Sequence, residues 1–213
     1  MSKLTSGILG PLKGKIGGVV GSTWKGIPVL KTKPASVANP RTAAQVTQRN
    51  AFTEAVAFAR VILVTIIKPL WDRFAQGQSG FNRFISVNIG NWDGSAFETP
   101  ENIEISRGIL AKADTFTASA DTGATQIDLN YSDDTGEGDA LSTDEIYVVV
   151  FNETTGFIQG FSSVATRDVP APHVIIDDAL EVDDVVHVYL AFKRADNTKV
   201  SNTNYSTFTF EGP

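Results

Sequence analysis

Carboxylate side chains gather in one loop of the sequence, DDTGEGDALSTD, at residues 133–144. Aligned with a calcium-binding loop of the EF-hand type, Asp133, Glu137 and Asp144 fall at the first, fifth and last ligand positions, and Gly138 falls at the invariant glycine. A threonine replaces the carboxylate at the third position, an aspartate replaces the final bidentate glutamate, and no flanking helices are expected. Asp133, Glu137 and Asp144 are therefore a calcium candidate. The alternative is a solvated connection between two strands, and no cofactor is expected.

A glycine- and lysine-rich stretch near the start, GPLKGKIGGVVGSTWKGIPVLKTKP at residues 10–34, is a candidate for phosphate binding. A P-loop requires G-x-x-x-x-G-K-[ST] between a strand and a helix. Here Gly14-Lys15 is followed by Ile16, and no helix follows whose N-terminus would receive a phosphate. The third glycine of a dinucleotide fingerprint is also missing. These departures exclude the common nucleotide-binding loops.

Groups for nucleophilic catalysis do not assemble in the sequence. The tetrapeptide GQSG at residues 77–80 lacks the last glycine of a nucleophile elbow and precedes a helical pattern. Only two histidines are present, His173 and His187. His187 alternates with the apolar row of VVHVYLAFK, so we expect it to be exposed on the opposite face of a strand. We assign no catalytic residue and expect that the chain is not an enzyme.

Charge is distributed very unevenly along the chain. Residues 1–50 carry eight basic and no acidic residues, whereas residues 101–213 carry six basic and twenty acidic residues. Two blocks of opposite sign indicate two modules in different environments. Non-specific contact with DNA is one interpretation of the basic block, because its lysines would neutralise phosphates and Trp24 would stack on a base. The lysines concerned are Lys3, Lys13, Lys15, Lys25, Lys31 and Lys33.

Several other classes of protein are excluded by what the 213 residues lack. Cysteine is absent, which removes disulfides and thiolate metal sites. The longest apolar run, residues 61–67, is far shorter than the roughly 18 residues that a membrane span needs. Residues 7–12 are too short and too rich in glycine for a signal peptide. We therefore expect no membrane partner.

The elements that would carry these groups begin with an extended arm, residues 1–38, which turns in a hairpin at Lys25-Gly26. Its glycines would weaken an isolated strand but allow another backbone to approach closely. A helical segment is expected over residues 39–100. Its first helix, capped by Asn39 or Thr42, runs to about Lys68, where Pro69 ends or kinks it. A further helix is expected over residues 78–89.

From residue 101 onward the apolar pattern has a period of two. Seven strand-like runs are separated by turn-forming residues, with no helical interruption, and the last two runs form a hairpin across residues 195–198. The runs are IEISRGIL, TQIDLNY, EIYVVVF, GFIQGFSSV, HVIID, DVVHVYLAFK and KVSNTNYSTFTF. The predicted fold class is therefore a multi-part α+β chain. Its arm and helices precede an immunoglobulin-like or fibronectin-like all-β sandwich at residues 101–213.

The stretch GILGPLKGKIGGVVGSTWKGIPVLKTKPASVANPRTAAQVTQRNAF resembles a family of uncharacterised proteins encoded by Bacteroidota bacteria and their phages. That family is marked by a GxxGKxGxxVG element, then WKG, then NPRTxxQxxQR, and the resemblance covers about residues 7–90. The one departure is Lys31, where an arginine is expected. The matching residues are Gly14, Lys15, Gly17, Val20, Gly21, Trp24, Lys25, Gly26, Pro34, Asn39, Pro40, Thr42, Gln45, Gln48, Arg49 and Phe52. The resemblance brings no catalytic residue, and it implies a phage or prophage setting.

The leading functional hypothesis is a non-enzymatic structural protein of a bacteriophage virion, made in the host cytoplasm. Its arm would add strands to neighbouring subunits in a multi-copy or homo-oligomeric assembly, while the sandwich projects or braces. A place in the capsid is favoured over neck or tail. The alternatives are a nucleic-acid-binding accessory protein and a surface module for a glycan or receptor. The expected partner-binding residues are Trp24, Lys25, Phe52, Trp71, Phe81 and Phe84.

Overall fold

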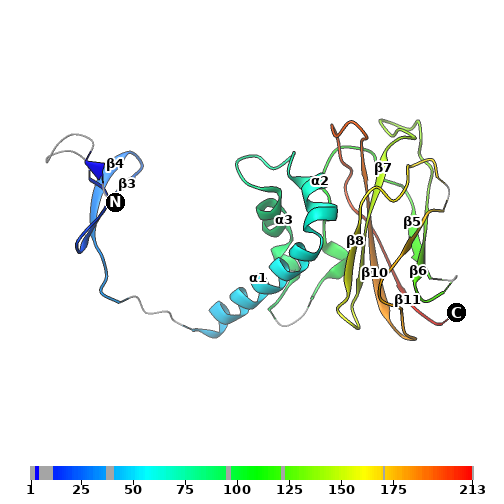
Figure 1. The fold of residues 1–213 in the computed structure, drawn as a ribbon, viewed down its shortest axis with the longest axis horizontal. Helices are drawn as coiled ribbons and strands as arrows, with labels where there is room; N and C mark the ends of the chain where they lie inside the picture. The colour runs from blue at the N-terminus through cyan, green and yellow to red at the C-terminus, as the bar shows by residue number, and fades with distance from the viewer. Residues whose placement is uncertain are drawn as a thin grey trace. The chain divides into compact units, whose positions relative to one another are not determined.

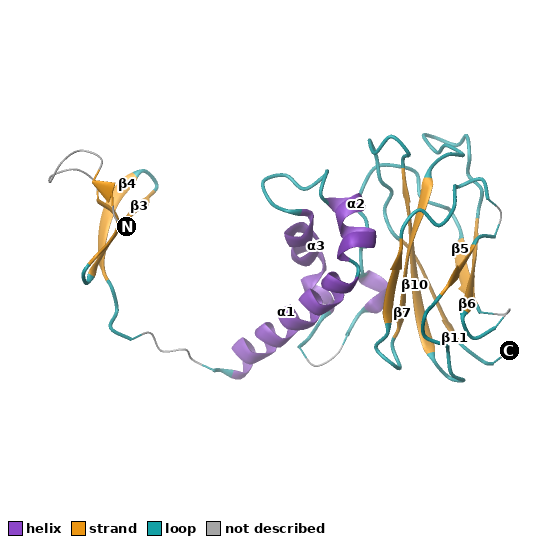
Figure 2. Cartoon of the chain, viewed as in Figure 1, coloured by secondary structure: helices purple, strands orange, loops and turns teal. Residues whose placement is uncertain are grey.

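The computed structural model describes residues 3–4, 12–36, 41–94, 97–120, 123–169 and 171–212. By their contacts the residues form two compact units, Met1–Thr42 and Ala43–Pro213. We call the first the N-terminal unit and the second the body. In Figure 1 the N-terminal unit is blue and the body runs from cyan to red, and Figure 2 distinguishes their helices and strands. The predicted helical segment and the predicted sandwich both lie within the body, apart from the first residues of the helical segment.

The N-terminal unit is one antiparallel sheet whose strands follow each other in chain order. Its strands are β1 (Lys3–Leu4), β2 (Leu12–Ile16), β3 (Val19–Trp24) and β4 (Ile27–Thr32). The turn between β3 and β4 is Lys25-Gly26, with φ values of +48° and +84°. Positive φ at both residues is what a tight hairpin requires, so the predicted turn is confirmed. A second tight turn at Gly17-Gly18 joins β2 to β3 and was not foreseen.

Gly21 is required by a close approach of two backbones inside this sheet. A Cβ atom added to Gly21 would lie 2.0 Å from the carbonyl oxygen of Leu12, whereas added Cβ atoms at Gly17 and Gly18 would meet nothing within 4 Å. The chain at Leu12 therefore crosses over Gly21, and any side chain there would push the two strands apart. The expected close approach is confirmed for this glycine.

The body begins with helices. They are α1 (Ala43–Val61), the π-helical turn η1 (Leu63–Ile67), α2 (Lys68–Trp71) and α3 (Gly80–Asn88), followed by the short 3₁₀ turns η2 (Ile89–Asn91) and η3 (Pro100–Asn102). The first helix starts directly after Thr42, and Asn39 lies outside the described residues. Ser79 caps α3 by accepting a hydrogen bond from the backbone N–H of Asn82, so the serine of GQSG has a structural role.

The predicted break before Pro69 is present as a π-helical turn. The N–H of Ile67 donates to the carbonyl of Ile62, five residues back. The helix axis bends by 71° between Ala43–Val61 and Leu63–Trp71, so the bend lies at Ile62, where the π-helical turn begins. Proline has no N–H, and its ring clashes with the carbonyl four residues earlier in an α-helix. The wider turn and the bend remove that clash, and the chain continues as α2.

Membrane-spanning length was assessed for the helices of the described residues. No single helix is both long and apolar enough to cross a membrane, and Ala43–Val61 with Leu63–Trp71 satisfies the test only as a bent pair.

The rest of the body is built from two antiparallel sheets. One has the strand order β5-β6-β9 and the other the order β11-β10-β7-β8. The strands are β5 (Phe116–Ser119), β6 (Gln126–Tyr131), β7 (Glu145–Asn152), β8 (Ile158–Phe161), β9 (His173–Ile175), β10 (Val185–Lys193) and β11 (Asn204–Thr209). Apolar side chains from both sheets form one shared cluster, so the sheets pack face to face. The chain is thus a mixed helix-and-sheet protein, as predicted.

The four-stranded sheet is covered on both faces, which explains the unbroken apolar run of β7. Ile146, Val148 and Val150 join the cluster between the sheets, whereas Val149 and Phe151 join the cluster under the helices. Figure 1 shows the helices on one side of β7, β8 and β10 and the three-stranded sheet on the other. A strand buried on both faces has no polar side to display, so strict alternation disappears.

One predicted strand is wrong and one real strand was missed. The run IEISRGIL at residues 103–110 alternates correctly, but it is a loop whose donors are satisfied by side chains. Glu104 N–H donates to Asn88, Ser106 N–H to Thr203 and Gly108 N–H to Asn202. The missed strand is β5, four residues surrounded by turn-forming residues. The other six strand predictions are confirmed, with boundaries shifted by a few residues.

Gly160 of β8 offers a test of how tightly the helices pack on the sheet. A Cβ atom there would lie 2.5 Å from Thr65 Oγ1 and 3.1 Å from a side-chain carbon of Ile66. We expect Gly160→Ala to lower the free energy of unfolding by about 1–3 kcal/mol, because the extra methyl overpacks this contact. Urea denaturation followed by tryptophan fluorescence measures the change.

Gly90 provides the matched control, because a Cβ atom there would meet nothing within 4 Å and its φ is not positive. Gly90→Ala should leave stability unchanged or raise it by about 0.4–1 kcal/mol, through the unfolded chain. Equal effects of the two substitutions would contradict the packing described for β8.

Candidate functional site

The N-terminal sheet separates its residues into two chemically different faces. Residues directly opposite each other on antiparallel strands share a face, and successive residues alternate. One face, which we call the uncharged face, holds Gly14, Ile16, Val19, Gly21, Thr23, Pro28, Leu30 and Thr32. The other, which we call the basic face, holds Lys15, Val20, Ser22, Trp24, Ile27, Val29 and Lys31.

Both faces leave large apolar side chains exposed. On the uncharged face these are Ile16, Val19 and Leu30, of which Leu30 is 67% exposed. On the basic face Trp24 and Ile27 are 62% and 58% exposed and lie opposite each other next to the turn. Apolar side chains this exposed on one small sheet make it a candidate interaction surface, because soluble proteins rarely leave them together in water.

The free edge of β4 is poorly suited to strand addition. The N–H of Lys33 donates to the carbonyl of Gly18, which directly precedes β3. By alternation Pro28, Leu30 and Thr32 therefore turn their backbone groups outward. Proline has no N–H to offer a new strand, and it is a common device for blunting edges. The predicted strand addition is therefore disfavoured at this edge, and the faces of the sheet are the better surface for a partner.

The six predicted partner-binding residues divide into two groups. Trp24, Lys25 and Phe52 are exposed, and the ammonium of Lys25 lies 5.2 Å from the centre of the Trp24 ring. Phe81 is half-buried against the core below the helices.

Trp71 and Phe84 require a correction. Both are buried in the core of the body, where Trp71 packs edge-on against Phe84 and donates its Nε1–H to the carbonyl of Ile105. They stabilise the chain itself and are not available to a partner. Sequence alone could not separate them from Trp24, because both kinds of aromatic residue sit among apolar neighbours.

The acidic loop does not bring its predicted ligands together. Asp133 is at the surface and accepts a hydrogen bond from the N–H of Thr135, whereas Asp144 is fully buried. The carboxylates that converge among the described residues, all within 4.8 Å of one another, are those of Asp114, Asp134 and Glu137. Asp134 already accepts hydrogen bonds from Ser132 Oγ and from the N–H of Asp114. Its carboxylate thus links the acidic loop to the segment before β5 at the surface of the body.

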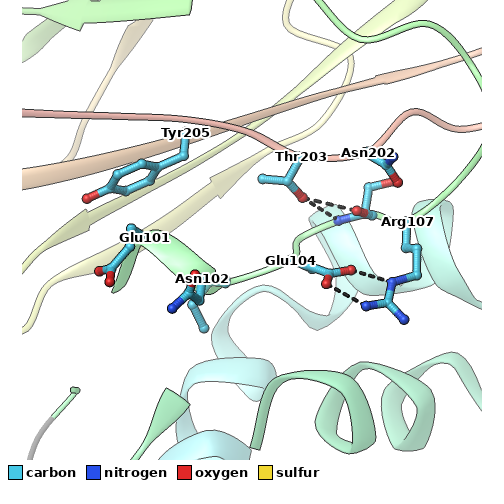
Figure 3. A pocket seen from close by; sticks show the side chains of 9 residues that line it. Glu101, Asn102, Glu104, Arg107, Asn202, Thr203 and Tyr205 are labelled. Atoms are coloured by element: carbon cyan, nitrogen blue, oxygen red, sulfur yellow. Dashed lines mark hydrogen bonds and ion pairs between the residues drawn. The ribbon is translucent and has the colours of Figure 1, made fainter. Parts of the chain in front are cut away.

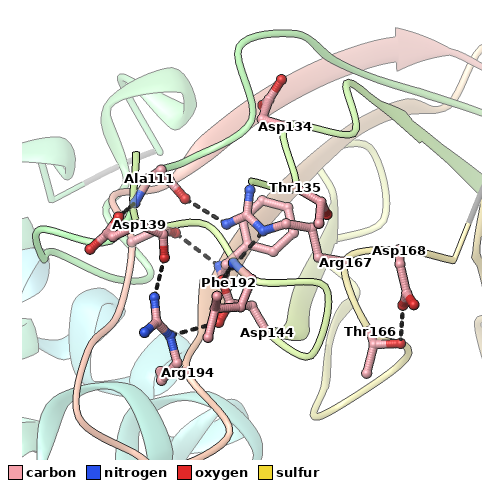
Figure 4. Close-up of polar contacts among 12 residues, drawn as sticks. Ala111, Asp134, Thr135, Asp139, Asp144, Thr166, Arg167, Asp168, Phe192 and Arg194 are labelled. Carbon is pink, nitrogen blue, oxygen red and sulfur yellow. Dashed lines mark hydrogen bonds and ion pairs between the residues drawn. The ribbon is translucent and has the colours of Figure 1, made fainter. Parts of the chain in front are cut away.

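Asp144 is the centre of a buried ionic network (Figure 4). Its carboxylate lies 2.9 Å from Nε of Arg194 and 3.5 Å from Nε of Arg167. Arg167 is fully buried, lies 3.7 Å above the ring of Phe192 and donates to the carbonyl of Ala111. Burial lowers the pKa of the Arg167 guanidinium, and the Asp144 carboxylate opposes that shift. The network joins the acidic loop to β10 and to the segment before β5.

A polar pocket of about 440 Å³ lies between the 101–107 segment and the start of β11 (Figure 3). It is lined by Glu101, Asn102, Ile103, Glu104, Ser106, Arg107, Asn202, Thr203 and Tyr205. Arg107 is neutralised by Glu104 through two hydrogen bonds of 2.5 Å. Thr203 Oγ1 accepts a hydrogen bond from the N–H of Ser106 and donates one to the carbonyl of the same residue. The Oγ atom of Ser106 is buried without a hydrogen-bond partner. The pocket therefore presents amide, carboxylate and hydroxyl groups suited to a polar ligand.

His187 lies beside this pocket and corrects the expectation of an exposed histidine. It is 5% exposed, because its side of β10 is the side covered by the helices. Its Nδ1 lies 2.8 Å from the Tyr205 hydroxyl and its Nε2 lies 3.0 Å from Glu153. A carboxylate, an imidazole and a hydroxyl are thus connected in one chain of contacts, and burial raises the pKa of the Tyr205 phenol.

Two features were missed from the sequence: the division of the N-terminal sheet into two faces, for which a signal was present, and the buried ionic network. Lys13 and Lys15, and again Lys31 and Lys33, are two residues apart. In paired strands this spacing places Lys15 and Lys31 on one face and leaves the other face without charge. The buried network had no comparable signal, since Arg167 and Arg194 are far from Asp144 in sequence.

We expect Asp144→Asn to destabilise the body strongly. The substitution keeps the size of the side chain but leaves the charges of Arg167 and Arg194 without their shared counter-ion. Breaking a buried pair in this way costs about 3–5 kcal/mol, which urea denaturation would measure. Asp133→Asn, in the same loop but exposed, is the control and should have a much smaller effect. If both variants unfolded at the same urea concentration, Asp144 would not be the centre of the network.

A match to a known protein family covers residues of both units. Residues 11–207 match the family described as "Family of unknown function (DUF6266)", from just before β2 into β11. Among curated proteins, none matches the chain. The predicted membership of an uncharacterised family is confirmed. The motif pattern of that family and its occurrence in Bacteroidota bacteria and their phages stay predictions. Because the match covers most of its length, the chain belongs to the DUF6266 family of unknown function.

Proposed function

We propose that the chain is a non-enzymatic structural protein of a bacteriophage virion, anchored to neighbouring subunits by its N-terminal sheet. The observation that carries the proposal is the uncharged face, on which Ile16, Val19 and Leu30 are exposed. Full burial of such side chains contributes about 1.5–3 kcal/mol each. Because these side chains are not buried within their own unit, the free energy of burying them is available for docking on another surface.

The body fits a bracing or projecting role. Its seven strands divide into the first, second and fifth in one sheet and the others in the second sheet. This division supports the inference of an immunoglobulin-like or fibronectin-like sandwich. The resemblance of the N-terminal segment to proteins of Bacteroidota and their phages supports the setting. We place the protein in the capsid in preference to neck or tail, after synthesis in the host cytoplasm.

Electrostatics favours the same arrangement. The N-terminal unit has seven basic and no acidic residues, whereas the body has eleven basic residues and all 24 acidic residues of the chain. In a particle filled with DNA, a basic unit directed inward and an acidic body directed outward would both be in favourable potentials.

Leu30→Asp tests the proposal directly, because it places a charge in the centre of the uncharged face. We expect the wild-type chain to be present in many copies per purified particle and the variant to be reduced at least tenfold. Quantitative mass spectrometry of purified particles, normalised to the shell protein, measures both.

Ile27→Asp is the matched control, since Ile27 lies on the same strand and is similarly exposed on the opposite face. It should be incorporated at close to the wild-type level. Absence of the wild-type chain from particles would refute the virion role, and equal loss of both variants would refute the role of the uncharged face.

A second candidate function is non-specific DNA binding, which the basic face favours. Lys15 and Lys31 share that face with the exposed ring of Trp24. Lysines beside an aromatic side chain neutralise phosphates and stack on bases in proteins that bind single strands.

The double substitution of Lys15 and Lys31 by alanine tests this alternative. Fluorescence anisotropy with a single-stranded oligonucleotide should show affinity that falls with salt, with a slope shallower in the variant by about 1.4 on logarithmic axes. An affinity that does not change with salt, or a slope that the substitution leaves unchanged, would eliminate the basic face as a DNA surface.

A further inference from the structure

The body carries an apolar groove of about 300 Å³ that its own residues do not fill. The groove runs between α1, the strands β7 and β8, and the segment that follows α3. It is lined by Glu54, Ala57, Phe58, Val61, Trp92, Phe97, Phe151 and Ile158. Val61 at its rim is 54% exposed. The rim of the groove is therefore accessible to an incoming side chain, whereas Phe58, Trp92 and Phe151 lie deeper and are largely buried.

The floor of the groove is a packed aromatic cluster. Phe58 contacts Trp92, Phe97 and Phe151, with ring centres 5.7–6.2 Å apart. Rings held against one another in this way form a preformed surface, so binding there costs little rearrangement. In the wall, Glu54 Oε2 is shielded from solvent and has no hydrogen-bond partner. An occupant of this groove should therefore be apolar and carry positive charge nearby.

The N-terminal sheet has this combination of properties. Leu30 is the most exposed side chain of the uncharged face, and Lys31 and Lys33 follow it in sequence on the other side of the strand. The unit has no acidic residue, so nothing in it would repel the acidic body. Opposite net charges of this size attract over distances of about 8–10 Å in physiological salt and accelerate association.

We propose that the N-terminal sheet of one copy docks by its uncharged face in the apolar groove of a second copy, with Leu30 as the inserted side chain. This inference rests on the proposed assembly function and names its partner as another copy of the same chain. Because the two surfaces differ, the contact is head-to-tail, and repetition of it produces a ring or an extended array. Multiple copies joined in this way are what a shell-associated protein requires.

The absence of cysteine from the chain allows a direct test by disulfide cross-linking. One full-length protein carries Leu30→Cys and a second, distinguished by an affinity tag, carries Val61→Cys. The two are mixed under mild oxidation, and the rate of heterodimer formation is measured by non-reducing electrophoresis. We expect this pair to cross-link at least tenfold faster than control pairs, and the rate to fall as salt is added.

Two control pairs test the face and the groove separately. Ile27→Cys with Val61→Cys presents the basic face, and Leu30→Cys with Val182→Cys presents an exposed residue outside the groove. Heterodimer rates equal to those of the controls would overturn the proposal. So would a Leu30→Cys/Val61→Cys double variant that closes only within one chain, because the sheet would then occupy the groove of its own copy.

The cross-linking experiment and the particle experiment test the docking inference and the proposed function separately. Loss of Leu30→Asp from particles, combined with no selective cross-linking, would mean that the uncharged face docks on a different subunit. Selective cross-linking by a chain that is absent from particles would instead support self-assembly and refute the virion role.

Discussion

Eight residues of β7 pair with eight residues of β10 in one antiparallel ladder, and nearly every side chain in it is buried. One face of the ladder packs on the three-stranded sheet and the other packs on the helices. The ladder therefore holds three layers together. For this reason the helices, which the sequence indicates as a separate segment, belong to the same unit as the strands.

Most of this architecture was predictable because it follows from local pattern. The long helix, the bend at Pro69, the hairpin at Lys25-Gly26 and six of the seven strands all follow from residue spacing and turn chemistry. The missed strand β5 is only four residues long and lies among turn-forming residues, and the falsely predicted strand has a different origin. Residues 103–108 alternate like a strand, yet side chains of Asn88, Thr203 and Asn202 take the place of a neighbouring strand. Sequence pattern reports which side chains are buried, but it does not report what satisfies the backbone.

The candidate surface was predicted only in part. Trp24 and Trp71 were both predicted to bind a partner, yet Trp24 is exposed and Trp71 is buried, since an aromatic residue gives the same signal in a core and in an interface. The division of the N-terminal sheet into a basic and an uncharged face depends on strand register, which the sequence indicates only once both tight turns are known. The groove depends on side chains from α1, β7 and β8 and on residues near 92–97, and no local pattern brings these together.

The order of elements in the body has a mechanical consequence for a chain that is held at its N-terminal sheet. Tension applied there enters the body through α1, the element that directly follows Thr42. The helix axis changes direction by 71° between α1 and the segment Leu63–Trp71, so a pull along α1 is not directed along the axis of α2. We expect such a force to act first on the apolar contacts of α1 and to reach the β7–β10 ladder only after these contacts are broken.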